Sequence, residues 1–200
     1  KLLKVPGELS GAYSVKEGTR IICNSAFWYC LSLSEIVIPN SVTSIGDLAF
    51  SFCSSLAEVV IPNSVVCING NPFWYWNGKL ECLSPSFVYE NNILFNKDKS
   101  RIISFRNQNL TSYVIPNNVT RIGDRAFSFC SSLAEVVIPN SVTRIGDSAF
   151  SFCSSLAEVV IPNSVTRIGD SAFEGCSSLA EVIIPDSITG IGDRAFSFCI

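Results

Sequence analysis

The chain has 200 residues, of which 48% are hydrophobic and only 16% are charged. This balance excludes a disordered chain, because it supplies enough apolar side chains for a continuous core. Fourteen basic residues against seventeen acidic ones give a net charge of -3, so the chain lacks the broad cationic surface on which nucleic-acid affinity depends. We therefore expect no nucleic-acid partner, and no transmembrane segment, since no apolar run approaches the roughly 18 residues needed.

A 23-residue repeat runs through most of the sequence. An Ile-Pro pair marks it at Ile38, Ile61, Ile115, Ile138, Ile161 and Ile184. A divergent copy precedes them at Val15–Val37, and residues 138–160 and 161–183 are identical at 20 of 23 positions. Repeats of this length predict a stack of similar units, in which each unit buries its apolar side chains against its neighbours.

One repeat shows the expected local structure. Leu156–Ile161 turns apolar side chains to one side and polar ones to the other, which predicts a short strand. Pro162–Asn163 ends that strand, because proline has no N–H to donate and asparagine favours a turn. Val165–Ile168 predicts a second strand, after which Asp170 is placed to cap a short helical turn at Ser171–Cys176.

This repeat resembles that of the BspA-like, or Treponema-type, leucine-rich repeat family. Residues 130–150, from Cys130 through Leu133, Ile138 and Ile145 to Phe150, match the family pattern C-x-x-L-x-x-I-x-I-P-x-x-V-x-x-I-G-x-x-A-F. The resemblance implies a curved solenoid with parallel strands. With the patterns above, we expect a repeat solenoid that is mainly β, with short helical turns and one β-hairpin insertion. The resemblance also implies an extracellular or cell-surface location and a role in adhesion.

The repeat is interrupted once, which predicts three parts of one continuous solenoid domain. Residues 1–83 form an N-terminal repeat block with degenerate first and third copies, and residues 115–200 form a C-terminal block. Between them, residues 84–114 lie outside the period. In this insertion Ile93–Phe95 and Arg101–Phe105 flank a polar turn, which predicts a β-hairpin.

Two interpretations of this irregular region remain open. The first is structural: the insertion is a modified coil of the solenoid. The second is functional, because aromatic anchors beside positive charge are typical of binding hot spots. The residues of this predicted recognition patch are Trp74, Tyr75, Trp76, Lys97, Lys99 and Arg101.

Cysteine recurs at one repeat position, so it must form a row along the stack. The row consists of Cys30, Cys53, Cys130, Cys153, Cys176 and Cys199. We expect these thiols to be buried, since cysteine behaves as a small hydrophobic residue, while a disulfide framework is the alternative for nine cysteines. A zinc site is not expected, because the chain has no histidine and no C-x-x-C pair.

Aromatic residues form two rows. The first predicts a core spine and consists of Phe27, Phe50, Phe73, Phe127, Phe150, Phe173 and Phe196. The second consists of Tyr29, Phe52, Tyr75, Phe129, Phe152 and Phe198, and Gly175 interrupts it. Because a core site would not tolerate an exchange of an aromatic residue for glycine, the second row should lie near the surface. Its rings either cover one another or, at Phe129 and Phe152, offer an apolar track to a partner.

Charged residues also recur in rows. Glutamate points outward from the first strand, on the expected concave face, at Glu35, Glu58, Glu135, Glu158 and Glu181. An apolar row flanks it, formed by Val37, Val60, Val137, Val160 and Ile183. This face is either simply solvated or an acidic stripe for a basic or amphipathic partner. Arg121, Arg144 and Arg167 form a shorter row on the second strand, so the two faces should differ in potential.

The sequence predicts a binding protein with no catalytic, metal or cofactor site. Without histidine there is no Ser/His or Cys/His catalytic machinery, and the carboxylates recur as equivalents in nearly every coil, whereas an active site is singular. We expect a cell-surface or secreted protein that binds a protein or another extracellular macromolecule, or adheres to host or neighbouring cells. The alternative is a scaffolding array in a larger protein, with no ligand of its own.

Overall fold

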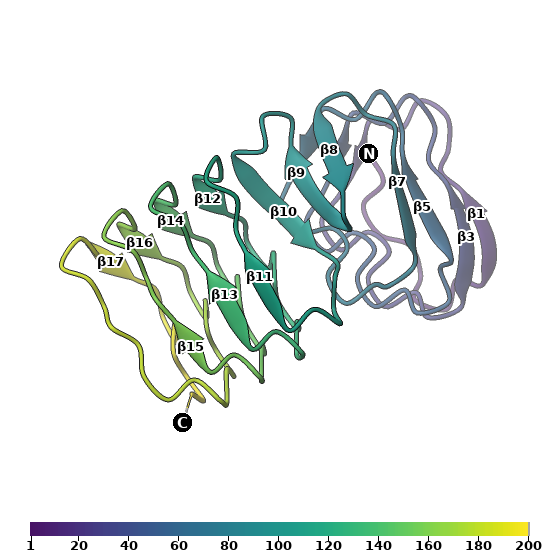
Figure 1. Cartoon of the computed structure of the whole chain (residues 1–200). Helices are drawn as coiled ribbons and strands as arrows, with labels where there is room; N and C mark the ends of the chain where they lie inside the picture. The colour runs from purple at the N-terminus through teal and green to yellow at the C-terminus, as the bar shows by residue number, and fades with distance from the viewer. Residues whose placement is uncertain (200) are drawn as a thin grey trace. The chain divides into compact units, whose positions relative to one another are not determined.

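The computed structural model describes residues 1–199, which contain seventeen short β-strands and no α-helix. None of these residues belongs to a helix that has the length and apolar character to cross a membrane. The chain divides into two compact units, Lys1–Tyr89 and Glu90–Ile200. Each unit is a β-solenoid in which the strands of one coil lie parallel to those of the next (Figure 1).

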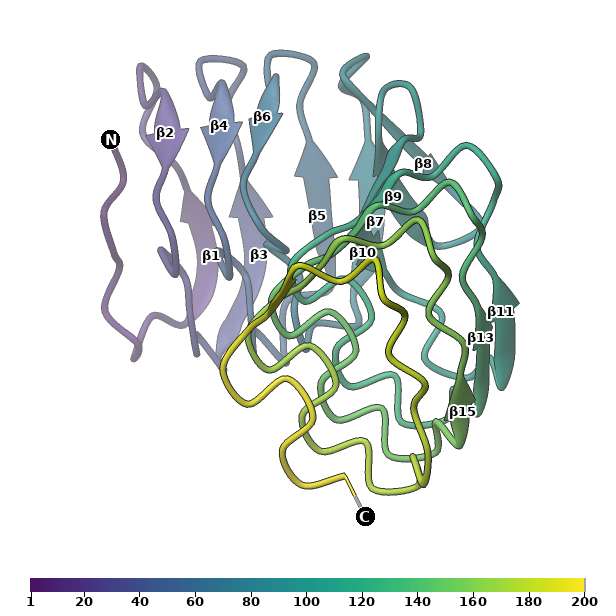
Figure 2. The same cartoon turned by 90° about the vertical axis from the view of Figure 1, so that its left-hand side faces the viewer.

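The first unit has two kinds of strand, which alternate along the chain (Figure 2). Its first strands are β1 (Gly11–Ser14), β3 (Leu33–Val37), β5 (Glu58–Ile61) and β7 (Lys79–Cys82). Its second strands are β2 (Ile21–Ile22), β4 (Ser44–Ile45) and β6 (Cys67–Ile68), which pair in parallel in that order. β1 pairs in parallel with β3, as β5 does with β7, and β8 (Phe87–Glu90) ends where the second unit begins.

The second unit begins with the predicted hairpin and continues as regular coils. β9 (Ile93–Asn96) and β10 (Arg101–Phe105) pair antiparallel, which confirms the β-hairpin. The first strands are β11 (Ser112–Val114), β13 (Glu135–Val137) and β15 (Glu158–Val159). The second strands pair in parallel in chain order, starting from β10. They are β12 (Arg121–Ile122), β14 (Arg144–Ile145), β16 (Arg167–Ile168) and β17 (Gly190–Ile191). Residues 101–114 therefore form part of the solenoid.

The core of each coil consists of the apolar positions that recur every 23 residues. Val142, Ile145 and Leu156 are fully buried, Ile145 on β14 and the other two in the segments that lead into β14 and β15. The predicted spine of phenylalanine rings is confirmed. The ring centroid of Phe150 lies 4.9 Å from that of Phe127 and 5.2 Å from that of Phe173, and the ring planes are nearly parallel. Phe105 of the insertion extends the spine, 4.6 Å from Phe127. Burial of these rings, repeated in every coil, stabilises the stack.

The expected helical turn at Ser171–Cys176 is not a helix. Glu174 and Cys176 donate to carbonyls three residues earlier, as in a series of turns. Ser171, Phe173 and Gly175 instead donate their N–H groups to carbonyls of the next coil, at 2.7 to 2.8 Å. Positive φ angles at Ser171 (52°) and Gly175 (71°) turn these groups outward along the stack, which an α-helix does not allow.

The predicted role of Asp170 is also different. Its Oδ1 atom accepts a hydrogen bond of 3.0 Å from the backbone N–H of Asp193, the equivalent residue of the next coil. Asp147 accepts in the same way from Asp170. The carboxylates thus link successive coils instead of capping the turn that follows them.

An additional partial coil precedes the predicted first copy. Leu2 forms a parallel bridge with Ile22, and the N–H of Val5 donates to the carbonyl of Ala26 at 2.9 Å. Val5 is buried, and β1 follows it. The sequence did not reveal this coil because it lacks the Ile-Pro pair and most of the repeat residues.

Candidate interaction surfaces

In the second unit the predicted acidic row is exposed and in register. Glu135 pairs with Glu158 across β13 and β15, and Glu158 forms a bridge with Glu181, so neighbouring residues are about 4.8 Å apart. Within residues 90–199, none of the three carboxylates has a cation within ion-pairing distance. In the first unit Glu58 differs, because its Oε1 atom lies 2.6 Å from Nζ of Lys79, its direct neighbour on β7.

The apolar row beside these carboxylates is exposed too. Val137, Val160 and Ile183 expose 44%, 66% and 74% of their surface. A groove of about 440 Å³ follows this face, with Glu158, Val160, Glu181 and Ile183 in its wall. A second groove of about 220 Å³, lined by Glu135 and Val137, shares Glu158 and Val160 with the first. The rows therefore form a continuous acidic and apolar surface.

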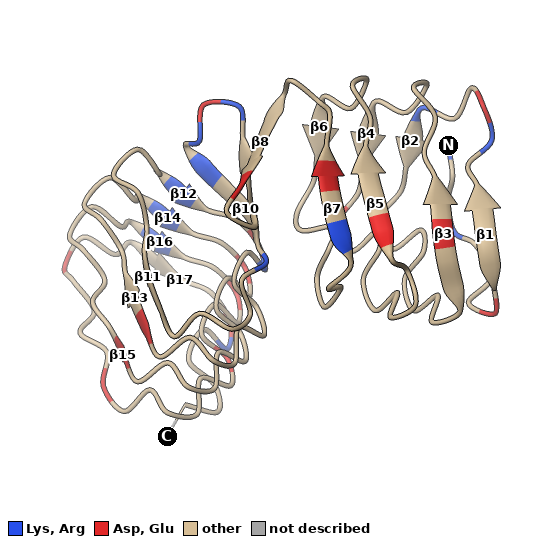
Figure 3. Ribbon diagram, turned by 45° about the vertical axis from the view of Figure 1, so that its right-hand side comes forward, with Lys and Arg blue, Asp and Glu red and all other residues tan. Residues whose placement is uncertain are grey.

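The arginine row lies on the other ladder of strands and is one residue longer than predicted. Arg121, Arg144 and Arg167 are in register on β12, β14 and β16, and Arg101 of β10 pairs with Arg121 (Figure 3). The sequence hid this extension, because Arg101 precedes Arg121 by 20 residues and not by 23. Nη2 of Arg121 lies 3.7 Å from Oδ1 of Asp124. Glutamates and arginines thus occupy separate faces of the unit.

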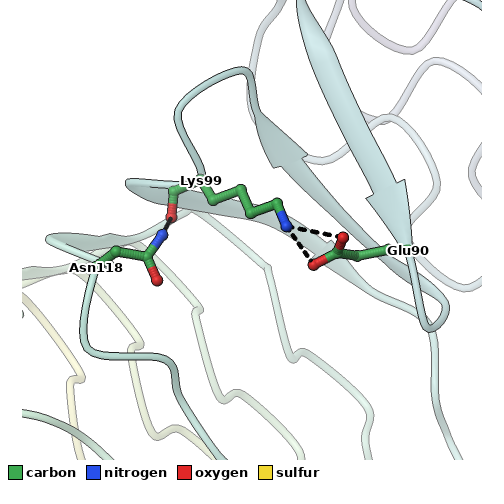
Figure 4. A network of polar contacts seen from close by, with 3 residues as sticks. All are labelled: Glu90, Lys99 and Asn118. Atoms are coloured by element: carbon green, nitrogen blue, oxygen red, sulfur yellow. Dashed lines mark hydrogen bonds and ion pairs between the residues drawn. The ribbon is translucent and has the colours of Figure 1, made fainter.

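The three cations predicted near the hairpin do not act together. Nζ of Lys99 lies 2.7 Å from Oε1 of Glu90, and its carbonyl accepts a hydrogen bond from Asn118 at 2.9 Å (Figure 4). Arg101 belongs to the arginine row, and Lys97 is exposed at the turn. Next to it, hydrogen bonds from Ser100 lower the pKa of Asp98.

In the first unit five aromatic rings form one connected surface cluster, which we call the aromatic cluster. It consists of Trp28, Tyr29, Phe52, Trp74 and Tyr75. The ring of Phe52 is central, with centroids of Trp74 and Tyr75 at 4.9 and 4.7 Å. Trp28, Tyr29 and Tyr75 are 40%, 49% and 50% exposed. Trp28 was missed in the sequence, although Trp28-Tyr29 occupies the same repeat positions as Trp74-Tyr75.

Trp76 lies outside this cluster and does not belong to an exposed patch. It is 3% exposed, and its indole N–H donates a hydrogen bond of 2.7 Å to the carbonyl of Leu56. Trp76 occupies the repeat position of the cysteine row, at which Cys53 and Cys130 are buried in their own coils. Its packing is therefore part of the core of the first unit.

The second aromatic row of the second unit lies at the surface, as expected. Phe129 and Phe152 stack with centroids 4.7 Å apart, and Phe152 remains 43% exposed. Both residues have positive φ angles, 64° and 57°. A Cβ atom at Gly175 would lie 2.6 Å from Cδ1 of Phe152, so the glycine accommodates the ring of the preceding coil. The rings thus cover one another along the stack.

The cysteine row is buried except at Cys199, which is half-buried, and all nine cysteines are free thiols. The expected thiol row is confirmed, and the disulfide alternative is wrong. The Sγ atom of Cys153 lies 3.1 Å from the carbonyl oxygen of Phe127 in the preceding coil. Burial raises the pKa of Cys53, Cys130 and Cys176 to about 12. These thiols stay protonated at neutral pH and cannot act as nucleophiles.

The repeats of this chain match the model of the BspA type leucine-rich repeat region over residues 16–100 and 101–200, in six copies. The chain belongs to this family. No curated protein matches the BspA-type chain. The family pattern fixes the buried positions of each coil, whereas the positions of Trp28 and Trp74 lie outside it. Trp28 and Trp74 thus mark two repeats of this chain, because the other repeats have serine or glutamate at this position.

Solved structures of bacterial leucine-rich repeat proteins are similar to this BspA-type chain. A leucine-rich cell surface protein of Faecalibacterium prausnitzii is 29% identical over 96% of this chain and 57% of its own, with a TM-score of 0.74. The pneumococcal vaccine antigen PcpA is 22% identical over 93% of this chain and 55% of its own, with a TM-score of 0.73, and shows the shared fold. This chain thus spans little more than half the length of either protein.

Proposed function

We propose that this chain is the binding region of a cell-surface or secreted protein, and that it attaches to a protein on host or neighbouring cells through the aromatic cluster. The observation that carries the proposal is a surface cluster of five connected rings, two of them tryptophan, of which Trp28, Tyr29 and Tyr75 are exposed and the other two half-buried. Tryptophan and tyrosine dominate the hot spots of protein interfaces. The name of the Faecalibacterium prausnitzii protein supports the cell-surface location.

The cluster is not needed to build a coil, which supports a binding role. Where the first unit has Trp28 and Trp74, the coils of the second unit have Ser128, Ser151 and Glu174. Where it has Tyr75, one of those coils has a glycine. The same local backbone therefore forms without the large rings.

The backbone beneath the aromatic cluster is left-handed at three positions. Tyr29, Phe52 and Tyr75 have φ angles of 66°, 60° and 56°. This left-handed conformation costs a residue with a Cβ atom about 1 to 2 kcal/mol, and stacking of two rings returns about 0.5 to 1.5 kcal/mol. The same angles recur at Phe129 and Phe152 in the second unit, so this strain belongs to the repeat, and it is the two tryptophans that distinguish the aromatic cluster.

We propose binding rather than catalysis as the activity of the chain. The glutamate and aspartate side chains recur as equivalents from coil to coil, and the row thiols are protonated. Within residues 1–199, no group of three or more Cys, Asp or Glu side chains is arranged to hold a metal ion. The exposed rings are the feature that distinguishes one part of the surface from the rest.

The proposal is tested by measuring binding of the chain to an array of purified extracellular domains from host and bacterial surface proteins. We expect a bound partner, and Trp28→Ser with Trp74→Ser should weaken its affinity by about tenfold or more, because loss of a hot-spot residue costs at least about 2 kcal/mol. Serine already occupies this repeat position at Ser51.

The matched control is Phe129→Gly with Phe152→Gly, which removes one half-buried and one exposed ring from the second unit at a repeat position where Gly175 occurs naturally. This variant should bind as the original chain does. If the tryptophan variant retains full affinity, the aromatic cluster is not the binding surface. If the chain binds no protein on the array, the scaffolding alternative is favoured instead.

A further inference from the structure

The second unit carries two charged ladders of opposite sign and identical spacing. The acidic row consists of Glu135, Glu158 and Glu181, and the arginine row consists of Arg101, Arg121, Arg144 and Arg167. Both follow parallel strands in register, so both repeat at about 4.8 Å. They belong to different ladders of strands in the same unit, on separate faces (Figure 3).

The acidic row is not neutralised within its own unit. Glu58 in the first unit is paired with Lys79, but none of the three carboxylates of the acidic row has an ion pair within residues 90–199. Like charges at this spacing repel one another, and solvent screens them only in part. A partner that brings one positive charge for each carboxylate would relieve this repulsion.

The arginine row is partly accessible: Arg167 is exposed, whereas Arg121 and Arg144 are half-buried with their Nε atoms covered. Aspartates recur three residues after each of these arginines. Oδ1 of Asp124 accepts from the N–H of Asp147 at 3.2 Å, and Asp147 accepts from the next aspartate, so these oxygen atoms are directed along the stack. Of these arginines, only Arg121 lies within 4 Å of a carboxylate in the described part of the unit. The adjacent threonines are exposed, and Oγ1 of Thr143 donates to the preceding coil.

We propose that the acidic row of one copy of this chain binds the arginine row of a second copy. The spacing argues for this partner, because the arginine row follows in-register parallel strands, as the acidic row does, and so presents cations about every 4.8 Å. An extended peptide places side chains of one face about 6.6 to 6.8 Å apart. Because this spacing is longer than that of the carboxylates, its charges no longer lie opposite them after two pairs.

The apolar row fits the same arrangement. Val137, Val160 and Ile183 lie beside the carboxylates in the wall of the groove. The aliphatic stems of arginines can cover such side chains while the guanidinium groups reach the carboxylates. The two rows lie on separate faces, so a dimer uses the acidic row of one copy and the arginine row of the other. The remaining arginine row and acidic row stay free, and further copies can bind to them.

Each exposed ion pair is weak, so association should be weak between free molecules and strongly dependent on salt. Chains held together on a cell surface would associate more strongly, because each contact raises the effective concentration of the next. This inference does not depend on the aromatic cluster, which belongs to the first unit. Failure of one proposal therefore leaves the other standing.

Sedimentation velocity of the 200-residue chain tests the proposal. In about 0.1 M NaCl the weight-average sedimentation coefficient should rise with protein concentration, and in about 1 M NaCl it should stay at the monomer value, because the Debye length falls from about 10 Å to about 3 Å. A chain that remains monomeric at the lower salt concentration overturns the proposal.

Charge reversal identifies the surfaces. Arg121→Glu, Arg144→Glu and Arg167→Glu together should abolish association, as should Glu135→Arg, Glu158→Arg and Glu181→Arg together. An equimolar mixture of these two variants should associate again, because each presents the charge that the other needs. If the mixture stays monomeric, the rows do not bind each other.

The control for net charge is Lys97→Glu with Arg125→Glu and Arg194→Glu. It changes the net charge by the same amount as reversal of the three row arginines, but outside the rows, and should associate normally. If it fails to associate, net charge and not the arginine row is responsible. Should the reversed variants lose their folded circular dichroism spectrum, replacement of the same three arginines by glutamine provides a milder test. Normal association of that glutamine variant overturns the proposal.

Discussion

The two units have the same coil but differ in how closely they follow the repeat. The second unit keeps the pattern almost unchanged, so its side chains form equally spaced rows of one kind, such as Glu135 and Glu158 on β13 and β15. The first unit departs from it at Trp28, Trp74 and Lys79. These departures produce single features: one aromatic cluster and one ion pair within an otherwise acidic row. Regular coils therefore give periodic surfaces, whereas irregular coils give unique ones.

The largest effect tests what the units share. Phe50 and Phe150 are fully buried in the spine, and each stacks between two neighbouring rings. Phe50→Ala and Phe150→Ala should each lower the free energy of unfolding by about 3 to 5 kcal/mol, since both leave a cavity in the core. Urea unfolding followed by circular dichroism measures this loss. A loss below about 1 kcal/mol in one unit would show that its spine contributes little.

An effect that is smaller for each pH unit should appear at high pH in both units, because each contains a row thiol whose pKa is about 12, such as Cys53 or Cys130. Below the ordinary pKa of 9.0 the thiols are protonated in both folded and unfolded chains, and stability is unaffected. Above pH 9.0 only the unfolded thiols lose protons. Stability should fall by up to about 1.4 kcal/mol per pH unit for each thiol, until the folded thiols ionise near pH 12.

Thermal unfolding at a series of pH values measures this loss, and Cys130→Ala serves as the comparison. Groups remote from Cys130 that titrate above pH 9.0 contribute equally in both proteins, whereas the pKa of Cys153, which burial raises first and Cys130 raises further, changes in the variant. The variant should therefore show a shallower decline than the original chain. Equal declines would contradict the assignment of the effect to the buried thiol.

The smallest effect concerns the ion pair that distinguishes the first unit. Lys79→Ala leaves Glu58 without its cation and makes this part of the first unit resemble the acidic row of the second. Because the pair is exposed, the midpoint of urea unfolding should not change measurably. Glu58→Gln should be equally neutral. A clear loss of stability in Lys79→Ala alone would mean that Glu58 requires neutralisation, whereas a loss in both variants would mean that the ion pair itself stabilises the fold.

Periodicity made much of this fold predictable. The inward positions of Val142, Phe150 and Cys153 follow from their recurrence, and the hairpin follows from two apolar segments around a polar turn. The exposure of Glu158 and Val160 follows from alternation along a strand. These features depend on side-chain spacing, which is visible in the sequence.

Other features depend on the backbone or on distances that the repeat conceals. Phe129 and Phe152 have left-handed φ angles, which aromatic residues usually avoid. The sequence therefore predicted a helical turn in the equivalent segment Ser171–Cys176, where the structure has a series of turns. The position of Arg101 in the arginine row was hidden by a coil of 20 residues. The burial of Trp76 was missed because an aromatic residue beside Trp74 and Tyr75 suggested a surface patch.

The hydrogen bonds between coils have a consequence for the length of the array. Oδ1 of Asp147 accepts from the N–H of Asp170, and the N–H of Ser171 donates to the carbonyl of Asp193. Each coil therefore offers the next coil the same donors and acceptors that the preceding coil offers to it. Gain or loss of one whole 23-residue coil in the regular part would restore every such contact, whereas gain or loss of a few residues would misalign them all. Recombination between the nearly identical segments 138–160 and 161–183 would change the number of coils in this way. The protein can therefore vary in reach over evolutionary time without acquiring a new fold.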